Sequence, residues 1–290
     1  MKYQIIVIGA GPAGLSAAIN AKILRQNVLL VGDTFGSQKT EIAPKVLNYL
    51  GIPDVDGKTL NQAFVQHAKQ LQVEFLQKKV HGVYKNGKQF MVDVGGDFLY
   101  ADSVILSTGV SSIPSIQNEE KFLGKGVSYC ATCDAPLLKD KTACVIGYDE
   151  ESIVEANYIS EICKKVYFLP MKDLKTSLNG TIEVLQNKPV SFEGDADGRA
   201  KTLTTDKGEI LADGFFVLKP LSATTLAPGL TADGNHVKAD KKGKTNIDGL
   251  FVAGDITGAP YKYQKSAGEG LVAAFSAYEY LLDLNKNPQQ

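Results

Sequence analysis

The sequence Gly9-Ala10-Gly11-Pro12-Ala13-Gly14 limits the choice of fold more than any other part of this 290-residue chain. It follows an apolar run at 4–8 and opens a segment, 12–24, whose small and apolar residues have helical spacing. In such a strand–turn–helix the first glycine permits the tight turn and the second lets a pyrophosphate approach the backbone. The third lets the helix pack closely on the strand, and the phosphates then lie at the positive end of the helix. The pattern predicts a dinucleotide site in an α/β domain.

A second strand–helix–strand pattern starts in the middle of the chain. Its expected elements are a strand at 142–146, a helix at 150–163 and a strand at 165–169, and a closing helix is expected at 266–284. We therefore predict an α/β protein with two Rossmann-like domains of the three-layer ββα type. The first domain, 1–113 with 240–290, is discontinuous around the second, 117–236.

Two cysteines, Cys130 and Cys133, are separated by two residues and followed directly by Asp134. Cysteines at this spacing can close a small disulfide ring, and a helix that begins nearby lowers the thiol pKa. Asp134 is placed to carry a proton to or from a thiol, provided that burial raises its own pKa. The motif predicts a redox-active dithiol.

A zinc site is the alternative use of such a pair, and it requires two further ligands. The candidates are Cys144, in an apolar strand, and Cys163, on a helix, and neither belongs to a second Cys-x-x-Cys motif. We expect both to be small buried hydrophobic residues and expect no metal.

Several further motifs occur in the order and approximate spacing of one known family. They are Gly36-Ser37-Gln38, Asn48-Tyr49, Thr108-Gly109, Cys130–Asp134 and Ala253-Gly254-Asp255, together with the glycine turn. With them the chain resembles, over essentially its whole length, the low-molecular-weight thioredoxin reductases.

This resemblance implies a disulfide reductase with FAD in the first domain, a homodimer, and thioredoxin as protein substrate. It implies that Cys133 lies nearer the flavin and that Cys130 is its partner thiol, while the cysteine that attacks thioredoxin stays open. The FAD-binding residues that it implies, with Asp33 placed one residue late for a ribose contact, are Gly9, Ala10, Gly11, Pro12, Ala13, Gly14, Asp33, Ser37, Gln38, Asn48, Val80, Thr108, Gly109, Gly254, Asp255, Lys262 and Tyr263.

The second domain lacks the features with which this family binds NADPH. Only Gly147 of the expected glycine triplet is present, and three acids, Asp149 to Glu151, stand where the phosphates would pass. At an effective dielectric constant near 20, one like-charge pair at ~4 Å costs about 4 kcal/mol. The basic cluster for the 2′-phosphate is also missing, because Arg25 and Arg199 are the chain's two arginines.

The sequence is similar in these respects to a ferredoxin-linked flavoenzyme branch of the family. The stretches that carry this similarity are 129–137, 146–148 and 257–261. Reduced ferredoxin is then the expected electron donor. The reduction potential of a plant-type ferredoxin lies near −400 mV and that of thioredoxin near −270 mV. The gap of about 130 mV corresponds to roughly 6 kcal/mol of free energy for two electrons.

Three other functions are compatible with parts of the sequence. They are an NADPH-dependent thioredoxin reductase with an atypical site, a dithiol oxidase that passes electrons to O₂, and a non-catalytic flavin-binding sensor or interaction protein. The complete Cys130–Asp134 motif favours a reductase. The net charge of −1 gives no reason to expect nucleic acid or an anionic membrane as partner. The short N-terminal apolar run and the cysteine usage lead us to expect a cytoplasmic protein.

Overall fold

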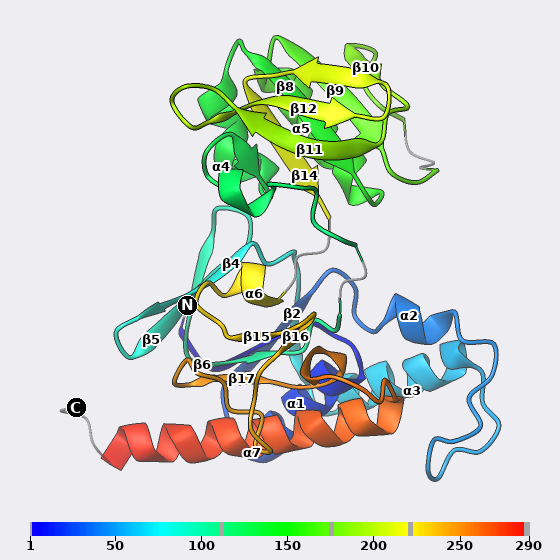
Figure 1. The fold of residues 1–290 in the computed structure, drawn as a ribbon. Coiled ribbons are helices and arrows are strands. Elements are labelled where there is room, and N and C mark those ends of the chain that lie inside the picture. Colours follow the sequence, from blue (N-terminus) through cyan, green and yellow to red (C-terminus); the bar gives the residue numbers. More distant parts are fainter. Residues whose placement is uncertain (1, 111–112, 174–176, 220–222, 287–290) are drawn as a thin grey trace. The chain divides into compact units, whose positions relative to one another are not determined.

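The computed structural model describes residues 2–110, 113–173, 177–219 and 223–286 (Figure 1). The chain forms two compact units. Unit 1 contains Met1–Ser111 and Ser222–Gln290, and unit 2 contains Ser112–Leu221.

Unit 1 is built on a seven-stranded sheet. Strands β3, β2, β1, β6 and β17 run parallel, and β4 and β5 extend the sheet with antiparallel pairing. The elements of the unit are β1 (Lys2–Ile8), α1 (Pro12–Ile23), β2 (Val28–Gly32), α2 (Gln38–Glu41), α3 (Gly57–Gln70), β3 (Glu74–Gln77), β4 (Gly82–Asn86), β5 (Gln89–Asp93), β6 (Phe98–Leu106), α6 (Ala223–Leu226), β15 (Ala232–Asp233), β16 (His236–Val237), β17 (Leu250–Val252), the 3₁₀ turn η3 (Asp255–Thr257) and α7 (Tyr263–Lys286).

Helices α1 and α7 pack side by side in unit 1 (Figure 1). Their contact is close because small residues meet there. A Cβ atom added at Gly270 of α7 would lie 2.1 Å from the carbonyl oxygen of Ala13. The same buried cluster holds Ala17, Ala273 and Ala277. Such packing fixes α7 against the helix that follows the glycine turn.

Unit 2 combines a parallel sheet with a second, antiparallel layer. The parallel strands are ordered β10-β9-β8-β14-β7, and β11-β12-β13 form the three-stranded antiparallel sheet. The elements are the 3₁₀ turn η1 (Glu120–Phe122), β7 (Val127–Ser128), α4 (Ala131–Asp134), the 3₁₀ turn η2 (Ala135–Leu138), β8 (Thr142–Gly147), α5 (Glu151–Ile162), β9 (Lys165–Pro170), β10 (Ile182–Val184), β11 (Pro189–Gly194), β12 (Ala200–Thr205), β13 (Gly208–Leu211) and β14 (Gly214–Leu218). The predicted α/β class with Rossmann-like sheets is confirmed.

The boundary between the units differs from the sequence prediction. We placed 117–236 in the middle domain, whereas the structure assigns the chain from residue 222 onwards to unit 1. The reason is that α6 contacts β4 and β16, so this segment packs on unit 1. The elements concerned are two to four residues long, too short for a periodic pattern.

Among the described residues, no helix combines the length and the apolar character needed to cross a bilayer.

Candidate functional site

The turn between β1 and α1 has the geometry of a phosphate-binding loop. The amide of Gly9 donates to the carbonyl of Val31 at 2.8 Å. A Cβ atom at Gly14 would lie 1.7 Å from the carbonyl oxygen of Gly9, so glycine is required there by packing. At Gly11, by contrast, the nearest atom to an added Cβ is the Ser37 Cβ at 3.9 Å. The space in front of Gly11 is therefore open, as a bound pyrophosphate needs.

Two further predicted segments lie at the same edge of the sheet. Thr108 and Gly109 follow β6, and Gly254 and Asp255 follow β17. Strands β6 and β17 are parallel neighbours in the sheet. The hydroxyl of Thr108 is buried and has no hydrogen-bond partner among the residues that the structure describes. A buried polar atom of this kind marks a place where a ligand group can bind. The open cradle at Gly11 and this hydroxyl fit a dinucleotide across the strand ends.

Side chains from α7 hold the Gly254-Asp255 turn, and sequence reasoning missed them. The Glu269 carboxylate accepts hydrogen bonds from the amide of Gly254 at 2.9 Å and from the hydroxyl of Thr257 at 2.8 Å. Lys265 forms an ion pair with Glu269 at 3.0 Å and donates to the carbonyl of Gly254. The i, i+4 spacing of Lys265 and Glu269 is the available sequence signal, but it does not reveal that both face a turn earlier in the chain.

The next predicted residues, Asp33, Ser37 and Gln38, lie in the short loop between β2 and α2 or at the start of α2. Gly32 ends the strand and Asp33, the next residue, is exposed. The amide of Ser37 donates to Oδ1 of Asn61 at 2.9 Å, and Gln38 begins α2. Asn61 is buried and was not anticipated, because α3 brings it to Ser37 from 24 positions away.

The remaining predicted residues are spread over three segments of unit 1. Val80 is buried, three residues beyond the end of β3. Asn48 is exposed, and Lys262 lies just before Tyr263, which opens α7. Burial and then the Asp255 carboxylate raise the pKa of the Tyr263 phenol. Tyr263 thus lies within electrostatic range of Asp255, and the side-chain amide of its neighbour Gln264 donates to the Asn48 carbonyl at 3.0 Å.

In unit 2, Cys130 and Cys133 form a disulfide. Cys130 is buried and precedes the first residue of α4, and Cys133 is partly exposed. The Sγ atom of Cys130 accepts a hydrogen bond from the amide of Cys133 at 3.2 Å, and the Thr132 hydroxyl lies 3.5 Å from it. Hydrogen bonds to a sulfur favour its thiolate form once the disulfide is reduced. The predicted dithiol is therefore present as a bonded pair.

Asp134 is half-buried and is held by a residue that sequence reasoning missed. The hydroxyl of Ser128, at the end of β7, donates to Oδ2 of Asp134 at 2.5 Å. The same hydroxyl lies 3.1 Å from the amide nitrogen and 3.2 Å from the carbonyl oxygen of Cys130. Ser128 therefore links the carboxylate to the backbone of the disulfide.

The residue before the disulfide belongs to a buried polar cluster. The hydroxyl of Tyr129 donates to Glu119 at 2.7 Å, and Lys219 forms an ion pair with the same carboxylate at 2.7 Å. Glu119 and Lys219 are both almost fully buried. Burial and then Glu119 raise the pKa of Tyr129, and for the same reasons that of Tyr148 rises to about 12. This cluster anchors the chain on the N-terminal side of Cys130.

At the second glycine turn, a helix amide that could bind a phosphate already has a partner. Asp149 places its Oδ1 atom 3.0 Å from the amide of Ser152, in the first turn of α5. This carboxylate therefore takes the helix amide that a phosphate would otherwise use. Gly147 is required for packing, because a Cβ there would lie 2.3 Å from the Ser152 hydroxyl. The loop keeps its strand-to-helix geometry, and the Asp149 carboxylate competes with an anion for the Ser152 amide.

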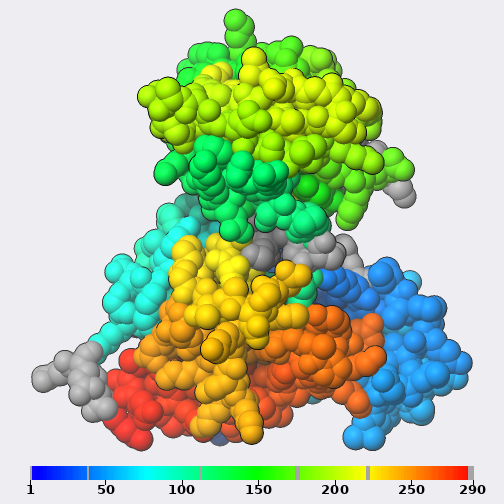
Figure 2. Space-filling model, in the orientation of Figure 1, coloured from blue at the N-terminus to red at the C-terminus, as the bar shows by residue number. Residues whose placement is uncertain are grey.

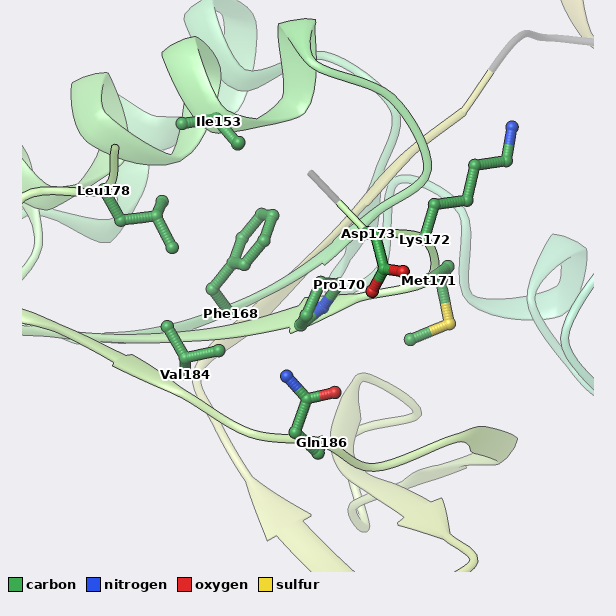
Figure 3. Close-up of a pocket in the computed structure, with 9 residues that line it drawn as sticks. All are labelled: Ile153, Phe168, Pro170, Met171, Lys172, Asp173, Leu178, Val184 and Gln186. Carbon is green, nitrogen blue, oxygen red and sulfur yellow. The ribbon is translucent and has the colours of Figure 1, made fainter. Parts of the chain in front are cut away.

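A pocket of about 530 Å³ lies at the carboxyl end of β9 (Figure 3). In an open α/β sheet this is the position for the nucleoside end of a dinucleotide. Lys172 is the one cation among the described lining residues, and Asp173 next to it carries the opposite charge. Arg199 lies elsewhere, in the turn between β11 and β12. The pocket has no basic cluster for a 2′-phosphate in the part of unit 2 that is described.

The other two cysteines are free and buried, as predicted. Burial raises the pKa of the Cys144 thiol, and burial together with Asp213 raises that of Cys163 to about 11. Both thiols are therefore protonated and unreactive near neutral pH.

Comparison with known proteins covers nearly the whole chain. A family model described as pyridine nucleotide-disulphide oxidoreductase matches residues 3–270. The thioredoxin reductase of Ureaplasma parvum is 30% identical over 96% of this chain and 97% of its own length. That of Bacillus subtilis is 27% identical over 98% of this chain and 96% of its own length.

Two solved structures of ferredoxin-flavin thioredoxin reductases from Clostridium acetobutylicum are similar to this chain. One is 45% identical, covers 99% of this chain and all of its own, and has a TM-score of 0.91. The other is 40% identical, covers 97% of this chain and 99% of its own, and has a TM-score of 0.89.

Proposed function

The chain belongs to the pyridine nucleotide-disulphide oxidoreductase family, and on that premise we propose that it is a ferredoxin-dependent flavin thioredoxin reductase. The observation that carries the proposal is the combination of an intact Cys130–Cys133 disulfide with a second turn whose helix amide is taken by Asp149. The similarity to the two clostridial enzymes supports it. A chain with this dithiol and without a phosphate site needs a donor other than NADPH.

FAD is the cofactor, and when bound it collects single electrons and delivers a pair of them. In unit 1 the residues that would hold it are those of the glycine turn, with Thr108 and the Gly254-Asp255 turn at the neighbouring strand ends. Their open cradle and unpaired hydroxyl fit this group. We propose Ser37, Gln38, Asn48, Val80, Lys262 and Tyr263, with Asp33, as further contacts.

The dithiol carries the electrons to the protein substrate. Two electrons and two protons convert the Cys130–Cys133 disulfide to two thiols. One thiolate attacks a sulfur of the thioredoxin disulfide, which forms a mixed disulfide and releases a thioredoxin thiolate. The second cysteine then attacks the mixed disulfide, so that Cys130 and Cys133 are joined again and thioredoxin leaves as a dithiol. Asp134, the neighbour of Cys133, gives and takes the proton at sulfur.

Turnover with thioredoxin tests this function. Under anaerobic conditions, chemically reduced ferredoxin should support continuous reduction of thioredoxin disulfide, because the overall transfer from ferredoxin to thioredoxin is downhill by the potentials given above. The measurement is the rate of thioredoxin thiol formation. Its control contains ferredoxin and thioredoxin without the enzyme, and an equal rate in that control would contradict the proposal.

A homodimer is the assembly that we propose. Leu271, Phe275 and Leu282 on α7 share one helix face and are 39–45% exposed. Figure 2 shows α7, orange to red, at the surface of unit 1. An apolar stripe of this kind is a common subunit interface. Sedimentation at the 31.2 kDa mass of one chain would contradict the dimer.

We also place the enzyme in the cytoplasm, where thiols are kept reduced.

A further inference from the structure

The hydroxyl of Ser128 has three polar neighbours around the redox centre. Its Oγ atom lies 2.5 Å from Oδ2 of Asp134, 3.1 Å from the amide nitrogen of Cys130 and 3.2 Å from the Cys130 carbonyl oxygen. Ser128 is 8% exposed, so water does not compete freely for these contacts. A hydroxyl has one proton and two lone pairs, which means that it cannot donate to the carboxylate and to the carbonyl at the same time.

The arrangement can be satisfied in each protonation state of Asp134. When Asp134 is a carboxylate, Ser128 donates to Oδ2 and accepts from the Cys130 amide. When Asp134 is protonated on Oδ2, that proton is donated to Ser128, and the Ser128 proton turns to the Cys130 carbonyl. The Cys130 amide keeps its acceptor throughout. A proton can thus arrive at Asp134 or leave it without movement of the carboxyl group.

We propose that Ser128 is a positioning residue for the disulfide exchange, which it serves by holding the Asp134 carboxyl in place in both of its protonation states. The proposal rests on the role of Asp134 given under the proposed function. Strand β7 supplies the rigid support, because Ser128 pairs with Phe216 of β14 in the parallel sheet.

The ionisable side chains on the elements packed against α4, the helix of Asp134, come from α5. The turn η2 has none, and α5 carries Glu151, Glu155, Tyr158 and Glu161.

The test is a double-mutant cycle on the holoenzyme. The protein is reduced with dithionite, freed of reductant and mixed with oxidised thioredoxin, so that the electron donor plays no part. The measured quantity is the rate of exchange as a function of thioredoxin concentration. We expect Asp134→Asn to slow the maximal rate by about 10²- to 10⁴-fold. Ser128→Ala should slow it on the order of 10- to 100-fold with the half-saturating thioredoxin concentration unchanged.

The double variant separates positioning from a structural effect. Because Ser128 acts through Asp134, adding Ser128→Ala to Asp134→Asn should cause no further loss. Ser128→Thr, which keeps the hydroxyl, should restore the rate to within about threefold of the unmodified protein, since the same hydrogen bonds can form. Ser160→Ala is the matched control: it removes a hydroxyl from α5 that donates to the Asn157 carbonyl.

The possible results distinguish the proton-transfer role of Asp134 from the positioning role of Ser128. Full exchange activity in Asp134→Asn would refute the proton-transfer role in the proposed function, and the Ser128 proposal with it. A slow Asp134→Asn enzyme combined with a fully active Ser128→Ala enzyme would overturn the Ser128 proposal alone. The Ser128 proposal would also be overturned if the two rate losses multiply in the double variant. It would be overturned as well if Ser128→Thr, with normal flavin content and melting temperature, stays as slow as Ser128→Ala.

Discussion

Replacement of either Cys130 or Cys133 by serine is expected to abolish thioredoxin reduction while FAD stays bound. The two sulfurs are bonded to each other, so neither cysteine can complete the cycle alone. The proposed flavin contacts lie in unit 1 and the disulfide in unit 2, which is why cofactor content should not change. Steady-state turnover and the flavin absorbance of each purified variant are the measurements.

The single-cysteine variants should also capture the substrate. When the remaining thiol can reach thioredoxin, the mixed disulfide has no second cysteine to resolve it and accumulates. It is detected as a band on a non-reducing gel, and the variant that traps it identifies the attacking cysteine.

The buried cysteines supply the control for this experiment. Cys144→Ala and Cys163→Ala should remain active with a loss of stability of about 1 kcal/mol, because both thiols are buried and protonated. Full activity in Cys130→Ser or Cys133→Ser would refute the assignment of the redox pair.

Gly11→Val is expected to give a folded protein with little FAD. Gly11 has φ −74° and ψ −175°, a backbone conformation that valine adopts readily, and the nearest described atom to an added Cβ is 3.9 Å away. The new side chain would instead fill the space in which the pyrophosphate approaches the backbone. The measurement is the number of FAD molecules per chain, together with the circular dichroism spectrum.

Gly268→Ala is the control for the glycine variant. Gly268 lies in α7 with open space around an added Cβ, so alanine should keep full FAD content and stabilise the helix by up to about 1 kcal/mol. Gly14→Ala is less informative, because its Cβ would collide with the Gly9 carbonyl and disturb the turn itself. A Gly11→Val protein with one FAD per chain would show that the turn does not bind the cofactor.

Local pattern was sufficient to predict the long elements of both units. Strand β1 and helices α1, α5 and α7 have apolar residues at the spacing of their own secondary structure, and the predicted bounds differ from the observed ones by three residues or fewer. The end of the middle domain could not be predicted in this way, since α6, β15 and β16 are fixed by tertiary contacts.

The motif residues of the candidate site could also be predicted from the sequence, but the residues that hold them in place by hydrogen bonds could not. Glu269, Asn61 and Ser128 act through hydrogen bonds whose partners are 15, 24 and 6 positions away, respectively. Such partners are chosen by the packing of a helix or a strand end, and a single sequence carries no periodic signal for them. The expectation that NADPH binds poorly also comes from the sequence itself, because the acids at 149–151 and the missing glycines can be read from it directly.

The identity of the electron donor is the central claim, and anaerobic reduction of the bound flavin by two donors tests it most directly. Flavin absorbance is followed after addition of millimolar NADPH and, separately, of reduced ferredoxin, with dithionite as the control that every flavin can be bleached. We predict rapid bleaching by ferredoxin, weakened by added salt where lysines steer the encounter. NADPH should bleach the flavin only very slowly, because Asp149 takes the helix amide and Lys172 is the one cation among the described residues that line the pocket. Complete bleaching by micromolar NADPH within seconds would contradict the account and make this chain an NADPH-dependent reductase.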